Sequence, residues 1–360
     1  MTDRKTVCFS CLTPYHVFVS YILSKTVYKN DYKMILFSDH YLKQVYERSM
    51  GLKLWDKIIL IEEKNKPWNL IQPQLQQIQT VLKDIDVLHY FSWGSISNSV
   101  LMNFISNNTR LILTDEGVMT YSIKEFYHNW KKTNNIQYDP VDFNRISEIW
   151  LFDTQLYISE LNKPLKDIEF KTFLDGDFKF EFCNDLNVLF DYKHEKRDWD
   201  ILFFDQPLAL ANLISYSEEK LLLMRILQEA KGFKLFIKKH PSDYAGKYTN
   251  LGVHILQCGN IPWEVVYLNE YIENGLNKQN KLYMTYTSSA MLNTRIIFKD
   301  LDASSYFITL RKLLKNFSEG FRQDKTTEKL FQKFRELYGK NFYEIESFEE
   351  LKNVINGLSL

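Results

Sequence analysis

The sequence predicts an α/β protein built from two Rossmann-like domains that face a central cleft. Three observations support this fold class. Apolar, strand-like runs alternate with helix-like segments from the N-terminus onward, the same alternation restarts at residue 200, and a strongly charged stretch separates the two series. Repeated strand–helix–strand order is typical of a parallel sheet with helices on both faces. The length of 360 residues allows two domains of ordinary size.

The N-terminal domain is predicted to span residues 1–190. Its first strand is TVCFSCL, and a helix is expected to follow, because Thr13 can cap its free N–H groups and Pro14 fits its first turn. Further strands are expected in YKMILFS, KIILIE, DVLHYFS and RLILTD, and further helices from Trp68 to Lys83 and in SISNSVLMNFIS. This order predicts one parallel sheet.

A linker is predicted at residues 191–199, where the charged run DYKHEKRDWD interrupts the apolar pattern. The C-terminal domain is expected at residues 200–310. It has predicted strands in DILFFDQP, FKLFIKKHP, GVHILQ and KLYMTYTSS, and an amphipathic helix in SEEKLLLMRILQEA. Residues 311–360 are expected to form helices, as is the segment FITLRKLLKNF that leads into them.

The composition is that of a soluble globular protein and gives no support to nucleic-acid binding. Lys plus Arg number 45 and Asp plus Glu also number 45, so no overall positive field attracts a polyanion. The N-terminal stretch lacks the apolar core of a signal peptide, and no window holds the roughly 18 apolar residues that a membrane-spanning helix needs. We therefore expect a cytoplasmic protein.

The four cysteines are expected to be reduced thiols in the core. Cys8 and Cys11 have the spacing of a metal-binding pair, but no second pair or histidine cluster follows at the distance of a zinc site. The DGD segment at residues 175–177 is the nearest match to an Asp-x-Asp metal motif. It is interpreted as a turn, because no apolar strand leads into it. No metal is expected.

Polar residues gather at the ends of the predicted strands, which is where open parallel sheets bind ligands. In the first domain, RLILTDEG places Asp115 and Glu116 side by side directly after an apolar run. A surface turn would explain the pair, whereas a catalytic base would explain why two acids that repel each other stand there. Repulsion from Glu116 would raise the pKa of Asp115 and improve it as a base.

In the second domain, His240 and Pro241 follow Lys238 at the end of IKKHP. Neighbouring positive charge lowers the pKa of a histidine, and a bound anion reverses that effect. His240 is therefore either an ordinary surface residue before a turn or a residue that a bound phosphate keeps protonated.

Two helix starts in the second domain carry further candidates. Ser288 and Ser289 in TYTSSA precede a helix-like run, where hydroxyls and free N–H groups can bind an anion, although capping alone needs only one serine. Glu264 in PWE opens the preceding helix. A carboxylate suits the helix dipole at that position and can also accept from the hydroxyls of a ribose.

Taken in order, three motifs resemble the signature of bacterial sialyltransferases in glycosyltransferase families 52, 38, 80 and 97. They are Asp115-Glu116-Gly117, His240-Pro241 and Ser288-Ser289. The opening CLTPYHVF is also similar to the Thr-Pro-Tyr start of family 52, the lipooligosaccharide sialyltransferases. We place families 52 and 97 ahead of the polysialyltransferases. The resemblance spans residues 8–292 and implies a GT-B fold, with a CMP-sialic acid donor held mainly by the C-terminal domain.

The resemblance implies an inverting transfer that needs no metal. Asp115 would deprotonate the acceptor hydroxyl, and His240 would donate to the departing CMP phosphate. Asp205, at the end of a strand in DILFFDQP, is the reserve candidate for the base, because some members of the group are suspected to use a different aspartate. Donors arranged in advance around the phosphate would stabilise its developing charge, so no cofactor is expected.

Seven residues are expected to bind the donor. They are Thr13, Gly117, Lys238, Pro241, Glu264, Ser288 and Ser289. By the resemblance, the two serines would bind the phosphate, Lys238 would approach the cytosine, and Glu264 would approach the ribose hydroxyls. The expected acceptor is a terminal galactose-type hydroxyl of a bacterial surface glycan, a lipooligosaccharide or capsule, which can be lipid-linked.

Two other functions stay open. One is a GT-B transferase with another donor, such as CMP-Kdo or a UDP-sugar, because the motifs report phosphate and nucleotide handling more clearly than the sugar. The other is a non-catalytic nucleotide- or glycan-binding protein. The linkage and the oligomeric state also stay open.

The basic stretch LRKLLKNF at residues 310–317 has two interpretations. It can rest peripherally on anionic lipid at the inner face of the cytoplasmic membrane, or it can be an interdomain helix with a solvated face.

Overall fold

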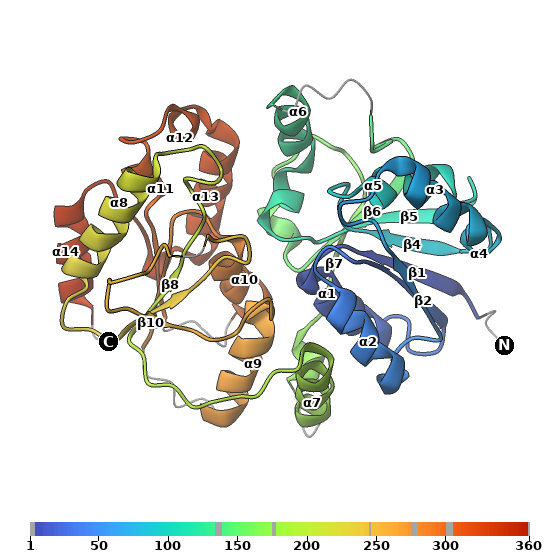
Figure 1. The fold of residues 1–360 in the computed structure, drawn as a ribbon, viewed down its shortest axis with the longest axis horizontal. Helices are drawn as coiled ribbons and strands as arrows, with labels where there is room; N and C mark the ends of the chain where they lie inside the picture. Colours follow the sequence, from blue (N-terminus) through green and yellow to red (C-terminus); the bar gives the residue numbers. More distant parts are fainter. Residues whose placement is uncertain are drawn as a thin grey trace. The chain divides into compact units, whose positions relative to one another are not determined.

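The computed structural model describes residues 4–133, 139–174, 178–244, 246–274, 280–299 and 305–358 (Figure 1). The chain divides into two compact units, Met1–Lys193 and His194–Leu360, and the boundary lies within the charged run DYKHEKRDWD. The DGD segment, for which the sequence predicts a turn, lies outside the described residues.

Unit 1 is built on a seven-stranded parallel sheet. Its strands are β1 (Thr6–Cys11), β2 (Tyr32–Ser38), β3 (Lys57–Ile61), β4 (Val87–Tyr90), β5 (Arg110–Thr114), β6 (Ile146–Leu151) and β7 (Leu165–Asp167). The strand order is β3-β2-β1-β4-β5-β6-β7, and all neighbouring strands are parallel. This is the order of a Rossmann fold, extended by one strand at the edge.

Helices follow the strands of unit 1. They are α1 (Pro14–Lys25), α2 (Lys43–Leu52), α3 (Trp68–Gln77), α4 (Gln79–Lys83), α5 (Ile96–Val100), α6 (Ile123–Thr133) and α7 (Phe178–Phe190), with the short 3-10 helices η1 (Leu101–Asn103), η2 (Val118–Ser122), η3 (Thr154–Leu156) and η4 (Lys171–Phe173). Helix α1 begins as predicted, with Thr13 as its cap and Pro14 as its first residue. The predicted helix from Trp68 to Lys83 is divided at Ile78 into α3 and α4.

Strands β6 and β7 are absent from the sequence prediction. All three residues of β7 are exposed, so the strand carries no apolar run that would mark it. In β6, Glu148 interrupts the apolar residues and pairs with Arg110 of the neighbouring β5. Both strands depend on pairing with the existing sheet, which local sequence does not report.

Unit 2 repeats the same architecture. Its strands are β8 (Ile201–Phe204), β9 (Leu235–Lys238), β10 (His254–Ile255), β11 (Leu282–Thr285), β12 (Tyr306–Thr309) and β13 (Phe342–Glu344). Their order, β10-β9-β8-β11-β12-β13, is again that of a Rossmann fold, and all pairs are parallel. The helices are α8 (Tyr216–Glu229), α9 (Trp263–Asn274), α10 (Ser289–Phe298), α11 (Arg311–Leu314), α12 (Glu319–Gln323), α13 (Lys325–Tyr338), η6 (Gly339–Asn341) and α14 (Phe348–Gly357).

The core of unit 2 shows why α8 and α14 lie side by side on one face of its sheet (Figure 1). Leu222 and Ile226 of α8 and Leu351 and Ile355 of α14 are buried in one cluster with Ile237 and other apolar residues of the strands. Each fully buried aliphatic side chain of this kind contributes about 1.5–3 kcal/mol. The predicted amphipathic helix is α8, and Ser215 caps it in a capping box with Glu218.

The prediction that the C-terminal segment is helical is partly wrong. The residues YFIT form strand β12, which pairs with β11, and Phe342–Glu344 forms β13, which pairs with β12. A short apolar run does not distinguish a strand from a buried helix by its periodicity. The pairing partner decides, and the rest of the segment is largely helical, as predicted.

The basic stretch LRKLLKNF does not form an amphipathic helix with a solvated face. Helix α11 has only four residues, and Arg311 is buried beside Asp324. Lys312 pairs with Glu346, and Lys315 pairs with Glu328. The three cations of the stretch are therefore engaged within unit 2, and peripheral membrane contact stays a prediction that this stretch no longer supports.

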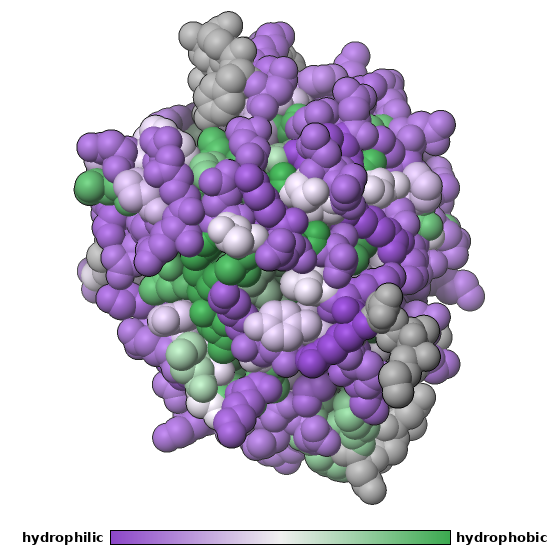
Figure 2. All heavy atoms as spheres, turned by 90° about the vertical axis from the view of Figure 1, so that its right-hand side faces the viewer, coloured by the Kyte–Doolittle hydropathy of each residue, from purple (hydrophilic) through white to green (hydrophobic). Residues whose placement is uncertain are grey.

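No helix in the described ranges combines the length and the apolar character that crossing a bilayer requires. The face that lies on the right of Figure 1 is mostly hydrophilic, with a smaller apolar area (Figure 2). All four cysteines are buried and unpaired, as predicted.

Candidate functional site

The strand order determines where polar side chains from distant parts of the chain meet. The order reverses between β1 and β4 in unit 1 and between β8 and β11 in unit 2. Ligands of such sheets bind beyond the carboxyl ends of the strands at these points. In unit 2, Phe204 pairs with both Lys238 and Thr285, so the last residues of three adjacent strands lie at one level. The segments that leave this edge carry the predicted motifs.

Asp115 follows β5, and its carboxylate is enclosed by donors. The residue is 1% exposed. Its Oδ1 accepts hydrogen bonds from the Gly117 N–H at 2.8 Å and the Tyr15 hydroxyl at 3.2 Å, and its Oδ2 accepts from the Tyr121 hydroxyl at 2.7 Å and the Phe152 N–H at 3.2 Å. Burial raises the pKa of this carboxyl to about 6, although all four donors act in the opposite direction. Because both carboxylate oxygens accept hydrogen bonds from the protein, the contacts of Asp115 fix its position and leave neither oxygen without a protein donor.

The backbone conformation at position 117 explains why the motif has a glycine there. Gly117 has φ 116° and ψ −167°, a region that side chains with a Cβ rarely adopt. This conformation directs the Gly117 N–H at Asp115, and the Glu116 N–H donates to the Thr120 hydroxyl at 3.0 Å. The turn thus holds the Asp115 carboxylate and the backbone of Glu116 in place.

Glu116 is the more accessible acid of the pair. Its side chain is 14% exposed, and a hydrogen bond from Ser92 holds it. Burial raises its pKa to about 7, and the negative charge of Asp115 adds to the rise. The sequence predicts that Glu116 raises the pKa of Asp115. In the structure the pKa of Asp115 is raised by burial, and it is the charge of Asp115 that adds to the raised pKa of Glu116.

His16 in the first turn of α1 faces this acid. Its Nδ1 accepts from the N–H groups of Leu12 at 3.1 Å and Thr13 at 3.4 Å, so the ring proton sits on Nε2. That nitrogen lies 3.9 Å from Glu116 Oε2, and the ring stacks on Phe91 with 4.6 Å between centroids. Burial lowers the pKa of His16 to about 3, which keeps it neutral. Thr13 therefore acts through the cap that orients His16.

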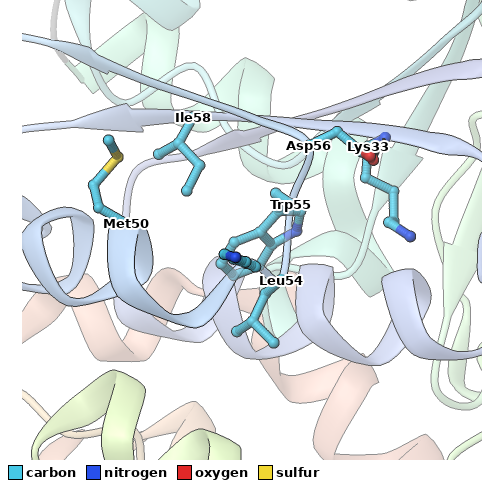
Figure 3. Close-up of a pocket in the computed structure, with 7 residues that line it drawn as sticks. Lys33, Met50, Leu54, Trp55, Asp56 and Ile58 are labelled. Atoms are coloured by element: carbon cyan, nitrogen blue, oxygen red, sulfur yellow. Dashed lines mark hydrogen bonds between the residues drawn. The ribbon is translucent and has the colours of Figure 1, made fainter.

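A hollow of unit 1 lies away from the acids. It is lined by Lys33, Met50, Lys53, Leu54, Trp55, Asp56 and Ile58 (Figure 3). These residues surround the starts of β2 and β3, the opposite ends of the strands from those that bind ligands in this fold. The Asp56 carboxylate is occupied by the Lys33 N–H at 2.8 Å and by Arg4 at 3.0 Å. The hollow contains none of the motif residues.

In unit 2, His240 lies exposed beyond β9 with one ring nitrogen fixed. Its Nδ1 accepts from the Ser242 N–H at 3.1 Å, so Nε2 carries the proton of the neutral ring. Nε2 has no hydrogen-bond partner among the described residues. The pKa of His240 is lowered, mainly by partial shielding from water and also by Lys238 and Lys247, while Asp243 acts in the opposite direction. Of the two cations beside His240 in the motif, Lys238 contributes to this lowering of the pKa, as a smaller cause than burial.

The two serines stand at the start of α10. Ser288 is the cap, and its hydroxyl accepts from the Ala290 N–H at 3.3 Å. Ser289 is the first helical residue and is half-buried. The segment before them is tied to β8, because the Gln206 side-chain oxygen accepts from the Thr287 N–H at 2.7 Å and its hydroxyl at 2.9 Å.

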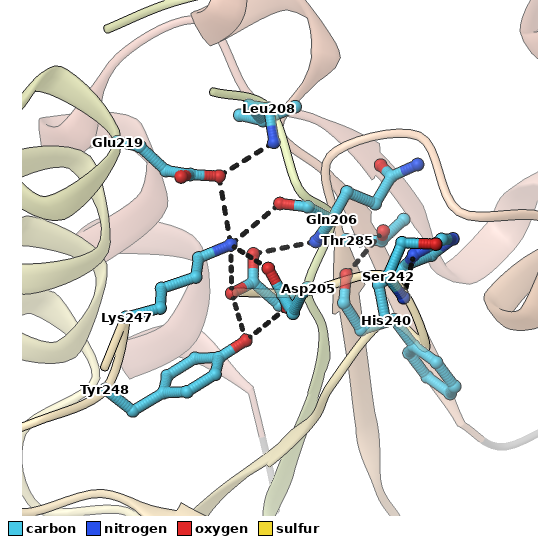
Figure 4. A network of polar contacts seen from close by, with 11 residues as sticks. Asp205, Gln206, Leu208, Glu219, His240, Ser242, Lys247, Tyr248 and Thr285 are labelled. Carbon is cyan, nitrogen blue, oxygen red and sulfur yellow. Dashed lines mark hydrogen bonds and ion pairs between the residues drawn. The ribbon is translucent and has the colours of Figure 1, made fainter. Parts of the chain in front are cut away.

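Asp205 belongs to a buried polar network around Lys247 (Figure 4). The Lys247 ammonium lies 2.8 Å from Asp205 Oδ2, 3.0 Å from Glu219 Oε1 and 3.2 Å from Asp243 Oδ1, and it also donates to the Gln206 carbonyl at 2.8 Å. The Tyr248 hydroxyl lies 2.7 Å from one oxygen each of Asp205 and Asp243. Asp205 therefore anchors the chain, with its side chain fully buried.

The charges of this network do not balance when every carboxyl is ionised. Asp205, Glu219 and Asp243 surround one ammonium, and the Tyr248 hydroxyl has one proton for two carboxyl oxygens. Burial raises the pKa of Asp205 to about 6 despite the nearby Lys247.

Two predicted donor-binding residues are buried. Glu264 is 2% exposed in the first turn of α9, and its carboxylate accepts from the Asn293 side chain of α10 at 2.9 Å. Lys238, the last residue of β9, is 8% exposed. Glu264 therefore joins two helices, and Pro241 lies next to His240 on the exposed loop.

The candidates are divided between the two units. Unit 1 holds Thr13, Asp115, Glu116 and Gly117; unit 2 holds Asp205, Lys238, His240, Pro241, Glu264, Ser288 and Ser289. Sequence reasoning missed the partners that orient them. Gln206 follows Asp205 in FFDQP, so the rule that ligands bind at strand ends could have identified it. Tyr121, His16 and Lys247 stand in no sequence pattern that would mark them as site residues.

A family model described as alpha-2,8-polysialyltransferase (POLYST) matches residues 8–307. Among solved structures, the chain resembles a UDP-GlcNAc 2-epimerase from Neisseria meningitidis bound to UDP-GlcNAc, with a TM-score of 0.50, 12% identity and 98% of each chain covered. It also resembles a protein from Listeria monocytogenes described as a UDP-N-acetylglucosamine 2-epimerase, with a TM-score of 0.50, 9% identity, and 98% and 95% of the two chains covered. No curated protein matches the sequence. At these identities the structures show the fold, and the GT-B fold class of two Rossmann-like domains is confirmed.

Proposed function

Because the chain belongs to the alpha-2,8-polysialyltransferase family, we propose that it transfers sialic acid from CMP-sialic acid to a glycan. Family membership makes it a glycosyltransferase of the sialyltransferase class. The CMP-linked donor, inversion at the anomeric carbon and independence from metal are parts of our proposal. The narrower likeness to glycosyltransferase family 52 stays a prediction, since the matching family is that of the polysialyltransferases.

The observation that carries the proposal is the pair of carboxyls after β5, one enclosed and one accessible. A base for sialyl transfer must reach the acceptor hydroxyl and be ionised near neutral pH. Asp115 has four donors on its two oxygens, whereas Glu116 is partly exposed and has a pKa raised to about 7. These contacts favour Glu116 as the proton acceptor and Asp115 as the residue that holds the turn.

In this mechanism the acceptor oxygen bonds to the anomeric carbon while Glu116 takes the hydroxyl proton. The bond from that carbon to the phosphate oxygen of CMP breaks, and the phosphate keeps the electron pair. Attack opposite the leaving group inverts the carbon. The side chain of Asp205 is fully buried and is bound by Lys247 and Tyr248. These contacts favour a role in holding the surrounding segments together over the role of reserve base.

We assign phosphate binding to His240 and the two serines. The fixed Nε2–H of His240 can donate to a phosphate oxygen, and the anion raises the pKa of the ring towards the imidazolium form. Ser288, Ser289 and the free N–H groups of the first turn of α10 supply further donors. Glu264 is bonded to Asn293, which favours a packing role over contact with the ribose.

The family description favours an acceptor that already ends in sialic acid, over the galactose-type hydroxyl predicted from the motifs. The purified protein should be incubated with CMP-sialic acid and either a lactose-type or a sialyl-lactose acceptor, followed by linkage analysis. Elongation of the sialylated acceptor alone would support the family activity. Transfer to lactose alone would favour the prediction from the motifs.

Variants separate the two acids. Glu116→Gln and His240→Ala should each lower kcat by at least about 100-fold, the range that a general acid or base contributes. Asp115→Asn should mainly lower stability. Full activity of Glu116→Gln would move the base to Asp115.

A donor panel of CMP-sialic acid, CMP-Kdo and UDP-sugars addresses the alternatives. Release of UDP or transfer of Kdo would overturn the proposed donor. Tight CMP binding without turnover of any donor would indicate a binding protein.

A further inference from the structure

The segment that presents His240 has few backbone hydrogen bonds of its own. This segment, residues 239–244, is called the His240 loop. Within it, the Asp243 N–H donates to the His240 carbonyl at 3.0 Å and the Ser242 N–H donates to its ring at 3.1 Å. These bonds set the ring relative to the loop. The loop itself is attached through side chains: the Tyr244 ring packs on Tyr216 of α8 with 5.0 Å between centroids, and Asp243 accepts from the Tyr248 hydroxyl at 2.7 Å.

Lys247 connects the His240 loop to two other segments. It is 2% exposed, and its three N–H bonds serve four acceptors from three parts of the chain. Asp243 belongs to the loop, Asp205 and the Gln206 carbonyl follow β8, and Glu219 lies on α8. A buried ammonium surrounded in this way holds these segments at fixed separations (Figure 4).

Gln206 connects Lys247 to the segment that precedes Ser288 and Ser289. Lys247 binds its backbone carbonyl, while its side-chain oxygen accepts both the N–H and the hydroxyl of Thr287. The next residue, Ser288, donates its N–H to the Thr285 hydroxyl, which donates in turn to the Phe204 carbonyl. A path of hydrogen bonds, joined by the residues Gln206 and Thr287 themselves, therefore runs from Asp243 through Lys247 to the start of α10.

We propose that Lys247 is a positioning residue that sets the His240 loop and, through Gln206, the Ser288–Ser289 cap at a fixed spacing for one phosphate group. This inference rests on the proposed function, because it assumes that both elements bind the phosphate of the donor. Among the described residues Lys247 contacts all three segments, whereas the Tyr248 hydroxyl joins only Asp205 and Asp243 and does not reach Gln206. Removal of the ammonium should release both phosphate-binding elements together.

The test uses amide hydrogen exchange in the full chain with three variants. Lys247→Met should speed exchange at least tenfold at Ser242, Asp243 and Thr287, whose N–H bonds report the loop and the cap. Gln206→Ala should do so at Thr287 alone. Arg311→Met is the matched control, because Arg311 is also a fully buried cation of unit 2 but bonds to Asp324. It should leave these three amides as in the wild type.

Kinetics complete the test. Lys247→Met should lower kcat for CMP-sialic acid at least tenfold and weaken the affinity for CMP, because both elements that bind its phosphate are released, while Arg311→Met keeps wild-type values of both. An equal loss of kcat in Arg311→Met would show a general effect of a buried cation and overturn the inference. Unchanged exchange at Thr287 in Lys247→Met would also overturn it.

A second variant guards against misfolding of Lys247→Met. Asp243→Asn keeps Lys247 paired with Asp205 and Glu219 and should speed exchange only at Ser242 and the residue at position 243. Unchanged exchange there would contradict the inference. The exchange measurements do not require catalytic activity. If the wild-type protein transfers no sialic acid, the proposed function is refuted, and the exchange rates still decide whether Lys247 holds the two elements.

Discussion

Replacement of Glu116 by glutamine keeps the size of the side chain and removes its charge, so it isolates the electrostatics of the acid pair. Burial and the charge of Asp115 raise the pKa of Glu116 from 4.5 to about 7. A folded state that raises the pKa of a carboxyl favours its protonated form. The resulting stability is fully present below the unfolded pKa and is lost as the pH rises through the folded pKa.

The magnitude follows from the size of the shift. The rise in the pKa of Glu116 from 4.5 to about 7 corresponds to about 3 kcal/mol of free energy of unfolding. Glutamine does not ionise and does not lose this free energy. The free energy of unfolding of Glu116→Gln, relative to wild type, should therefore grow by about 2–3 kcal/mol between about pH 5 and about pH 8.

Urea denaturation at several pH values in this range measures the difference directly. Glu346→Gln is the control: Glu346 is exposed, and its hydrogen bond with Lys312 lowers its pKa. A lowered pKa gives stability that is lost as the pH falls, below the range of the experiment, so this control should show a constant difference from wild type. A constant difference for Glu116→Gln as well would refute the argument from burial.

Three further predictions concern single contacts. Tyr121→Phe removes the hydroxyl 2.7 Å from Asp115 and should lower the free energy of unfolding by about 1–3 kcal/mol in urea; no loss would contradict the bond. Gly117→Ala should cost about 1–3 kcal/mol, because φ is 116° there, and wild-type stability would argue against the strained turn. In NMR titrations, CMP should raise the pKa of His240, since the phosphate favours the imidazolium; an unchanged pKa would remove His240 from the phosphate site.

The sequence predicts the fold well where each segment carries its own signal. Thr13 and Pro14 mark the start of α1, and the apolar runs mark β1 to β5, because local composition and capping chemistry decide those elements. Strands β7 and β13 carry no such signal, with three residues each, and they form by pairing with a neighbour that the local sequence does not specify.

For the candidate site, the sequence indicates positions at strand ends but not the contacts that the side chains make there. The strand-end rule directs attention to Asp115 in unit 1 and to His240 and Ser288 in unit 2, because parallel topology gathers the strand ends of each sheet at one edge of that sheet. Which acid is accessible depends on donors from Tyr121 and Phe152, which lie elsewhere in the chain. No short sequence pattern indicates hydrogen bonds between residues that are so far apart in the chain.

The origin of the four donors to Asp115 has a consequence for protein synthesis. They come from Tyr15, Gly117, Tyr121 and Phe152, so the carboxylate acquires its last partner only after β6 has been made. A ribosome-bound chain that stops before Phe152 holds this aspartate without its full shell of donors. Stalled nascent chains that end on either side of β6 should therefore differ in resistance to proteolysis, with protection of the first half appearing late in translation.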